Sequence, residues 1–122
     1  MDTMALQGGF AAPPQDAARA FRAALEAMAR PGTIHAVAGA VPPRPVSVAA
    51  GVVILALADR TTPIFLAPSH DHPAVRDWIA FHTGAPISGP DTACFALGIW
   101  TDLQPLGRFP VGTPEYPDRA VT

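Results

Sequence analysis

One long apolar segment, residues 46–58, constrains the fold of this chain more than any other feature. Apolar side chains occupy two sides of the segment at helical spacing: Val48, Val52, Leu55, Val53 and Leu57. A helix that is apolar on nearly every side must be buried on nearly every side. Ser47 is a typical N-cap residue, and the apolar run is much shorter than the roughly 20 residues that cross a bilayer. The segment therefore predicts a central core helix and no membrane anchor.

The segments after this helix alternate between strand and helix patterns. Residues 63–67 form a short apolar run rich in strand formers, and residues 93–100 predict a second strand. Between them, residues 73–82 have a helical pattern that opens with Pro73 and closes at Gly84. Helices that alternate with strands indicate an α/β fold.

The segments before the core helix predict one helix and one strand. Residues 15–30 form the clearest amphipathic helix of the chain. Its apolar stripe consists of three residues, Phe21, Leu25 and Met28. Residues 33–37 alternate as a strand does, and residues 1–14 show no sustained periodicity. We therefore expect a flexible N-terminal arm at 1–14 and a single domain over 15–122.

Composition excludes several classes of function. All 8 basic residues are arginines, so the chain offers neither a Schiff-base lysine nor a phosphate-loop lysine. The net charge of −2 and the pI near 6.0 give no electrostatic reason to expect nucleic acid or anionic lipid. One cysteine allows no internal disulfide, which makes a cytoplasmic location the default. Because 49% of the residues are hydrophobic, we expect an oligomer or a partner subunit.

Three histidines are candidates for chemistry, and each has a plain structural alternative. His70 and His72 resemble metal ligands, but they precede a proline-initiated helix, where such residues are common caps, and no second ligand cluster supports them. We therefore predict no metal site. His82 ends the apolar face of the helix at 73–82 and leads into Thr83. It is either a hydrogen-bonded core residue or a working residue of a site.

The first helix carries a second candidate, a patch for small anions formed by Asp16, Arg19 and Arg22. The alternative is a solvated helix face with a stabilising order of charges. No nucleophile elbow and no dinucleotide-binding glycine motif occurs in the sequence. We therefore assign no catalytic residue, and Arg19, Arg22, His82 and Thr83 remain the candidate ligand-binding residues.

Five segments, in this order and spacing, resemble the PhnH family, a subunit of the bacterial carbon–phosphorus lyase system. The segments are residues 14–32, 55–59, 62–66, 81–86 and 93–97. None of them is a diagnostic catalytic signature. The resemblance rests on the occurrence of all five in the same order over most of the chain from Phe10 onward.

The resemblance implies a role within an assembly. The family takes part in the step in which methylphosphonate displaces adenine from ATP to give ribose 1-methylphosphonate 5-triphosphate. It implies PhnG-, PhnI- and PhnJ-like partner subunits, with the nucleosidase chemistry on PhnI, and a homodimer. It also implies a three-layer α/β fold with a mixed sheet and helices on both faces, which resembles the pyridoxal-phosphate-dependent transferase fold without the cofactor. The family offers no catalytic residues to carry over.

Two classes of function follow from the sequence. The first is a non-catalytic structural subunit of the carbon–phosphorus lyase core complex, without activity of its own. The alternative is a small stand-alone enzyme or binding module for a phosphonate or phosphate ligand that uses His82, the His70/His72 pair, or Arg19 and Arg22. Members of the family extend several dozen residues past the position that matches Thr122. We therefore expect this chain to be the N-terminal part of a longer family domain, with a sheet that lacks its C-terminal strands.

Overall fold

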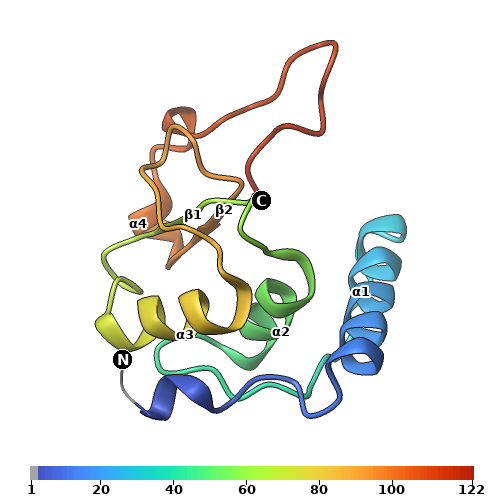
Figure 1. The fold of residues 1–122 in the computed structure, drawn as a ribbon. Coiled ribbons are helices and arrows are strands. Elements are labelled where there is room, and N and C mark those ends of the chain that lie inside the picture. Colours follow the sequence, from blue (N-terminus) through green and yellow to red (C-terminus); the bar gives the residue numbers. More distant parts are fainter. Residues whose placement is uncertain (1–2) are drawn as a thin grey trace.

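The computed structural model describes residues 3–122, and residues 1–2 of the predicted arm lie outside the described part. The described residues contain the helical elements η1 (Thr3–Leu6), α1 (Pro13–Ala29), α2 (Val48–Leu57), α3 (Pro73–Thr83) and α4 (Trp100–Leu103). The remaining elements are β1 (Ile64–Leu66), β2 (Phe95–Leu97) and η2 (Leu106–Arg108). Figure 1 shows α2 and α3 on one side of the two strands, with α1 beside α2. No helix in residues 3–122 has the length and the apolar content that a bilayer span requires.

The two strands confirm the α/β fold class, because they run parallel and are joined through a helix. Ile64 pairs with Phe95 and Leu66 pairs with Leu97. Ile87 lies beside Ile64 in a parallel bridge on one edge of the pair. On the other edge, the Thr122 amide donates to the Cys94 carbonyl (2.9 Å) and the Thr122 carbonyl accepts from Ala96 (2.8 Å). This alternating pattern is that of a parallel neighbour.

The strand predictions are right in part. β1 lies within the predicted run at 63–67, but β2 covers only three residues of the run at 93–100. Trp100 is already the first residue of α4. The strand predicted at 33–37 is wrong, because this segment has no strand partner in the described chain. Alternating apolar and polar residues are compatible with a strand, but a strand forms only where a neighbouring strand is available for pairing.

The core helix α2 begins where the sequence predicts. The Ser47 hydroxyl oxygen accepts a hydrogen bond from the Ala50 amide (3.1 Å), which satisfies one of the unpaired N–H groups of the first turn. Val52 and Ile54 are buried, whereas Val48 is 46% exposed and Val53 is half-buried. The prediction of burial on nearly every side is therefore wrong at these two residues.

Helix α1 buries a different face from the one that the sequence predicts. Its buried residue is Ala20, and the half-buried positions around Ala20 are mostly alanines: Ala17, Ala23, Ala24 and Ala27. The predicted stripe is exposed instead, at 52% for Phe21, 55% for Leu25 and 79% for Met28. The alanine face is what lies on α2, because small side chains let two helices approach closely. The larger apolar side chains of α1 are therefore left more than half exposed.

Helix α3 supplies the centre of the core. Val75, Trp78 and Ile79 are buried together with Ile64 from β1. The helix ends at Gly84, whose φ of 71° is the left-handed conformation that glycine adopts most easily. The Trp78 indole donates a hydrogen bond to the Gln7 carbonyl (3.1 Å) and so joins the N-terminal segment to α3. The flexibility of the arm and its boundary at residue 14 stay predictions, although α1 begins at Pro13.

Candidate functional site

The residues that the sequence predicts for a ligand site lie in separate parts of the fold. Arg19 and Arg22 are on α1, whereas His82 and Thr83 end α3. The His70/His72 pair precedes α3, at the opposite end of that helix from His82. The structure therefore does not bring the candidates together into one constellation.

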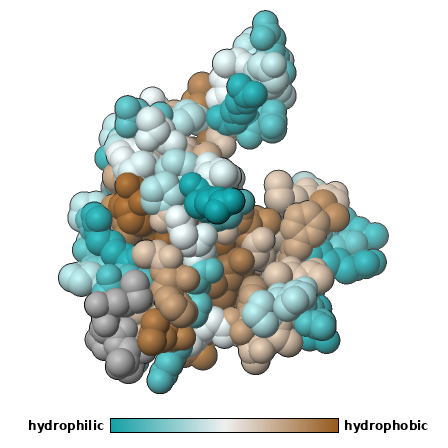
Figure 2. Space-filling model, in the orientation of Figure 1, coloured by the Kyte–Doolittle hydropathy of each residue, from teal (hydrophilic) through white to brown (hydrophobic). Residues whose placement is uncertain are grey.

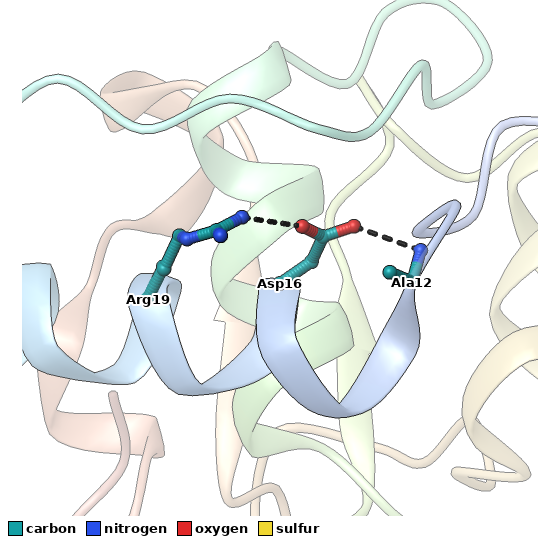
Figure 3. A network of polar contacts seen from close by, with 3 residues as sticks. All are labelled: Ala12, Asp16 and Arg19. Carbon is teal, nitrogen blue, oxygen red and sulfur yellow. Dashed lines mark hydrogen bonds and ion pairs between the residues drawn. The ribbon is translucent and has the colours of Figure 1, made fainter.

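Arg19 is held by a neighbouring carboxylate on the same helix. Asp16 accepts from the Arg19 guanidinium (3.2 Å) and from the Ala12 amide (3.0 Å), as Figure 3 shows. The second of these bonds caps the start of α1, where a negative charge is also favoured by the helix dipole. Both charged residues line an open cleft of about 350 Å³ between α1 and residues 36–39. The carboxylate offsets the positive charge that an anion would need there.

His82 and Thr83 both make hydrogen bonds that support the fold. The His82 Nε2 atom lies 3.1 Å from the Gln7 carbonyl, and because a carbonyl only accepts, Nε2 carries the hydrogen. The imidazole also packs against the Trp78 and Phe81 rings, with centroids 5.1 and 4.9 Å away. The Thr83 hydroxyl donates to the Ile79 carbonyl (2.7 Å) and accepts from the Ala85 amide (3.0 Å). These contacts close the end of α3 and fasten the N-terminal segment to it.

His70 and His72 differ in their surroundings. His70 is 9% exposed, whereas His72 is exposed at the N-cap of α3. Between them, Asp71 pairs with the Arg76 guanidinium, and this hydrogen bond lowers the pKa of the Asp71 carboxyl. Within residues 3–122, no three His, Cys, Asp or Glu side chains lie close enough together to hold a metal ion.

The carboxyl ends of β1 and β2 carry a polar cluster that the sequence reasoning did not identify. The Asp102 carboxylate accepts from the Ser69 amide (3.0 Å), and the Ser69 hydroxyl oxygen accepts from the Ile99 amide (3.1 Å). The Arg108 guanidinium donates to the Asp102 carbonyl (2.7 Å). Ligands of open α/β sheets bind outside the carboxyl ends of the strands, so this position is the one where a site is expected.

The Arg108 guanidinium lies against two aromatic rings that themselves pack edge to face. It is 5.1 Å from the ring centre of Phe65 on β1 and 5.1 Å from that of Phe109. The Arg108 Nε atom is buried without a hydrogen-bond partner among the described residues. Stacking of this kind fixes a planar guanidinium in one orientation and stabilises its charge.

The cluster contains Ser69, His70 and Asp102, but their bonds are not those of a catalytic triad. The Ser69 Oγ and His70 Nδ1 atoms are 2.9 Å apart, which suits proton exchange between them. A triad also needs a carboxylate on the other ring nitrogen, to orient the imidazole and stabilise its charge. Here the Asp102 carboxylate binds the Ser69 backbone instead. The arrangement joins the two strand ends and supplies no activated nucleophile.

The pH dependence of stability provides a test of the environment of His70. Burial and the nearby His72 lower the pKa of His70 below its ordinary value of 6.5. The unfolded chain therefore binds more protons than the folded chain just below pH 6.5, and the free energy of unfolding falls as the pH falls through this window. We expect His70→Gln to reduce the fall in melting temperature between pH values of about 7.5 and 5.5.

The matched control is His35→Gln, because His35 is an exposed histidine of the loop after α1. This control should keep the fall in melting temperature of the unmodified chain. An equal reduction in both variants, measured by thermal denaturation at a series of pH values, would contradict the role of His70.

Comparison with known proteins shows two matches. The family model described as "Bacterial phosphonate metabolism protein (PhnH)" matches residues 8–122. The chain is also 39% identical over 120 residues to the alpha-D-ribose 1-methylphosphonate 5-triphosphate synthase subunit PhnH of Rhizobium meliloti (strain 1021). The matched region covers 94% of this chain and 59% of that relative. The chain thus spans about three fifths of the length of the curated relative that it matches.

Proposed function

Because this chain belongs to the PhnH family of bacterial phosphonate metabolism proteins, we propose that it is a non-catalytic structural subunit of the carbon–phosphorus lyase core complex. In this role it would support the conversion of ATP and methylphosphonate to ribose 1-methylphosphonate 5-triphosphate. The observation that carries the proposal is the 39% identity to a subunit of the synthase that is named for this product.

Hydrophobic surface supports a role in an assembly. Large apolar side chains are exposed on several elements: Phe21, Leu25 and Met28 on α1, Val48 on α2, Phe81 on α3 and Trp100 on α4. Figure 2 shows brown, hydrophobic surface across the middle of the molecule and over the side of α1. Exposed apolar surface of this extent is typical of proteins that bury it against partners.

The hydrogen bonds of the candidate residues support a role without catalysis. His82, Thr83 and Ser69 each bind backbone groups of this chain, and Asp102 joins the two strand ends. His82 donates its Nε2–H to the Gln7 carbonyl and packs its ring against Trp78 and Phe81, so the side chain joins the N-terminal segment to α3, which favours the structural interpretation of this residue.

We also propose the partners, the location and the layer arrangement of this chain. The partners are PhnG-, PhnI- and PhnJ-like subunits together with a second copy of this chain, and the location is cytoplasmic. The sheet is part of a three-layer arrangement with helices on both faces, like that of pyridoxal-phosphate-dependent transferases but without the cofactor. The parallel pairing of β1 and β2, with further neighbours at Ile87 and Thr122, supports a larger sheet.

The test combines assembly with activity. The chain is co-expressed with the PhnG-, PhnI- and PhnJ-like subunits of the same organism, and a tag on the chain is used for purification. We expect the other subunits to co-purify, and we expect the isolated chain to release no adenine from ATP in the presence of methylphosphonate.

The opposite result identifies an enzyme. Release of adenine, or of inorganic phosphate from a phosphonate, by the isolated chain would overturn the proposal, provided that His82→Ala or His70→Gln abolishes the activity. Phe81→Ala is the matched control for His82→Ala, because Phe81 is an exposed neighbour on the same helix.

A further inference from the structure

We propose that α1 is the surface through which two copies of this chain associate, with the two α1 helices antiparallel about a two-fold axis near Ala24. We call the surface the outer face of α1 and define it by Phe21, Leu25 and Met28 with the flanking Arg22 and Glu26. The inference rests on the homodimer proposed above and adds the face and the orientation.

The outer face of α1 is larger and more apolar than a solvent-exposed helix face needs to be. Phe21, Leu25 and Met28 follow one another at spacings of four and three residues, so their side chains form a continuous stripe. All three are more than half exposed, while the small alanines of the same helix are turned toward α2. A monomeric domain would be more stable if it buried the large side chains and exposed the alanines, because burial of more apolar surface stabilises the folded state more. The stripe is therefore suited to burial by another molecule.

The flanking charges favour a second copy as that molecule. Arg22 and Glu26 lie on the same side of the stripe, one helical turn apart. In an antiparallel pair centred on Ala24, Arg22 faces Glu26 of the second copy, and symmetry repeats the contact with the roles exchanged. A parallel pair would instead place the charges of the two copies on opposite sides of the apolar stripe, where no Arg22–Glu26 contact forms. Arg22 forms no ion pair within residues 3–122, and Glu26 is 3.7 Å from Arg30.

The apolar side chains interleave in the same arrangement. With a rise of about 1.5 Å per residue, Leu25 lies close to the axis, and Phe21 and Met28 lie farther out in opposite directions. Side chains from the two helices then follow one another along the pair in the order Met28, Phe21, Leu25, Leu25, Phe21 and Met28. These six side chains form one apolar seam over roughly 12 Å of helix, with an ion pair on each side of the axis.

The sharpest test uses two charge reversals that are repulsive alone and complementary together. Arg22→Glu places two carboxylates opposite each other at both ends of the pair, and Glu26→Arg places two guanidinium groups opposite each other there. We expect each variant to raise the dimer dissociation constant by about tenfold or more, as measured by sedimentation equilibrium, because two attractive contacts become repulsive. An equimolar mixture of the two variants should form a heterodimer about as tightly as the unmodified chain forms its dimer.

Two controls test whether the effect is specific to the outer face of α1. Arg44→Glu changes the net charge as Arg22→Glu does, but Arg44 is an exposed loop residue far from α1 in sequence, so it should leave the dissociation constant unchanged. In a Cys94→Ser background, Leu25→Cys should give a disulfide-linked dimer on oxidation. Ala18→Cys should not, because the two residues 18 are separated by roughly 18 Å along the helices.

Three results would overturn the self-association through the outer face of α1. A dimer that neither charge reversal weakens, or a mixture that forms no heterodimer, overturns the inference and leaves the subunit proposal standing. An unmodified chain that is monomeric alone and binds the other subunits overturns the homodimer and this inference together, but not the subunit role. If Leu25→Cys links the chain to another subunit and not to itself, a partner of the complex covers the outer face of α1, and the self-association is wrong.

Discussion

Replacement of Trp78 by alanine is expected to lower the free energy of unfolding by about 3–5 kcal/mol, the usual cost of removing a large aromatic side chain from a packed core. Trp78 is 1% exposed and lies with Ile64, Val75 and Ile79 in the main hydrophobic cluster. The substitution also removes the indole that donates to the Gln7 carbonyl, so the N-terminal segment loses a contact with α3. A loss of this size is a large share of the roughly 5–15 kcal/mol that stabilises a typical domain.

The second tryptophan of the chain provides the control. Trp100 begins α4 and is 62% exposed, so Trp100→Ala should change the free energy of unfolding by no more than about 0.5 kcal/mol. Urea denaturation followed by far-ultraviolet circular dichroism measures both variants, since tryptophan fluorescence changes with the substitution itself. Equal losses in the two variants would show that the packing around Trp78 is not the centre of the core.

Replacement of Gly98 by alanine is expected to lower the free energy of unfolding by about 1–3 kcal/mol, because it overpacks the junction between the two strand ends. A Cβ atom at position 98 would overlap the Cβ atom of Ala67, and Leu103 Cδ2 is the next atom, at 3.3 Å. Ala67 is fully buried, and its Cβ atom is fixed by the backbone. Relief therefore requires β1 and β2 to move apart, which strains the bonds between Ser69, Ile99 and Asp102.

Gly107→Ala is the matched control for Gly98→Ala. A Cβ atom at Gly107 would meet nothing within 4 Å among the described residues, and its φ is not in the left-handed region. We expect this substitution to be neutral or slightly stabilising, because alanine restricts the unfolded chain. The comparison uses the same denaturation measurement. A neutral Gly98→Ala would mean that the ends of β1 and β2 are less closely packed than the structure describes.

The elements that the sequence predicts well are those with local signals. Ser47 caps α2, Pro73 opens α3 and Gly84 ends α3 in the left-handed conformation, and each of these follows from residue chemistry within one turn. The short apolar run at 63–67 also contains a strand. In each case the decisive interaction lies within a few residues of the signal.

The orientation of α1 is the feature of the fold that its sequence predicts least well. The helix has two apolar faces, one of alanines and one of large side chains, and periodicity alone favours the larger residues as the buried stripe. The alanines are buried because their size allows a close approach to α2. Selection between two apolar faces depends on the shape of the neighbouring surface, which no local pattern contains.

The ligand-binding role that the sequence suggests for Arg19, Arg22, His82 and Thr83 stays a prediction. The structure places His82 and Thr83 at the turn that ends α3, where the sequence puts them, and gives them structural hydrogen bonds. Asp102 and Arg108 were missed because Asp102 meets Ser69 from 33 residues away. The available signal was that two apolar strands are each followed by polar residues, since the carboxyl ends of parallel strands meet at one edge.

The most direct test of the account is native mass spectrometry of the chain co-expressed with the PhnG-, PhnI- and PhnJ-like subunits of its organism. We expect a single assembly that contains this chain together with those subunits, and an isolated chain that is inert toward ATP and methylphosphonate. A chain that stays separate from all three subunits while they assemble with one another would contradict it.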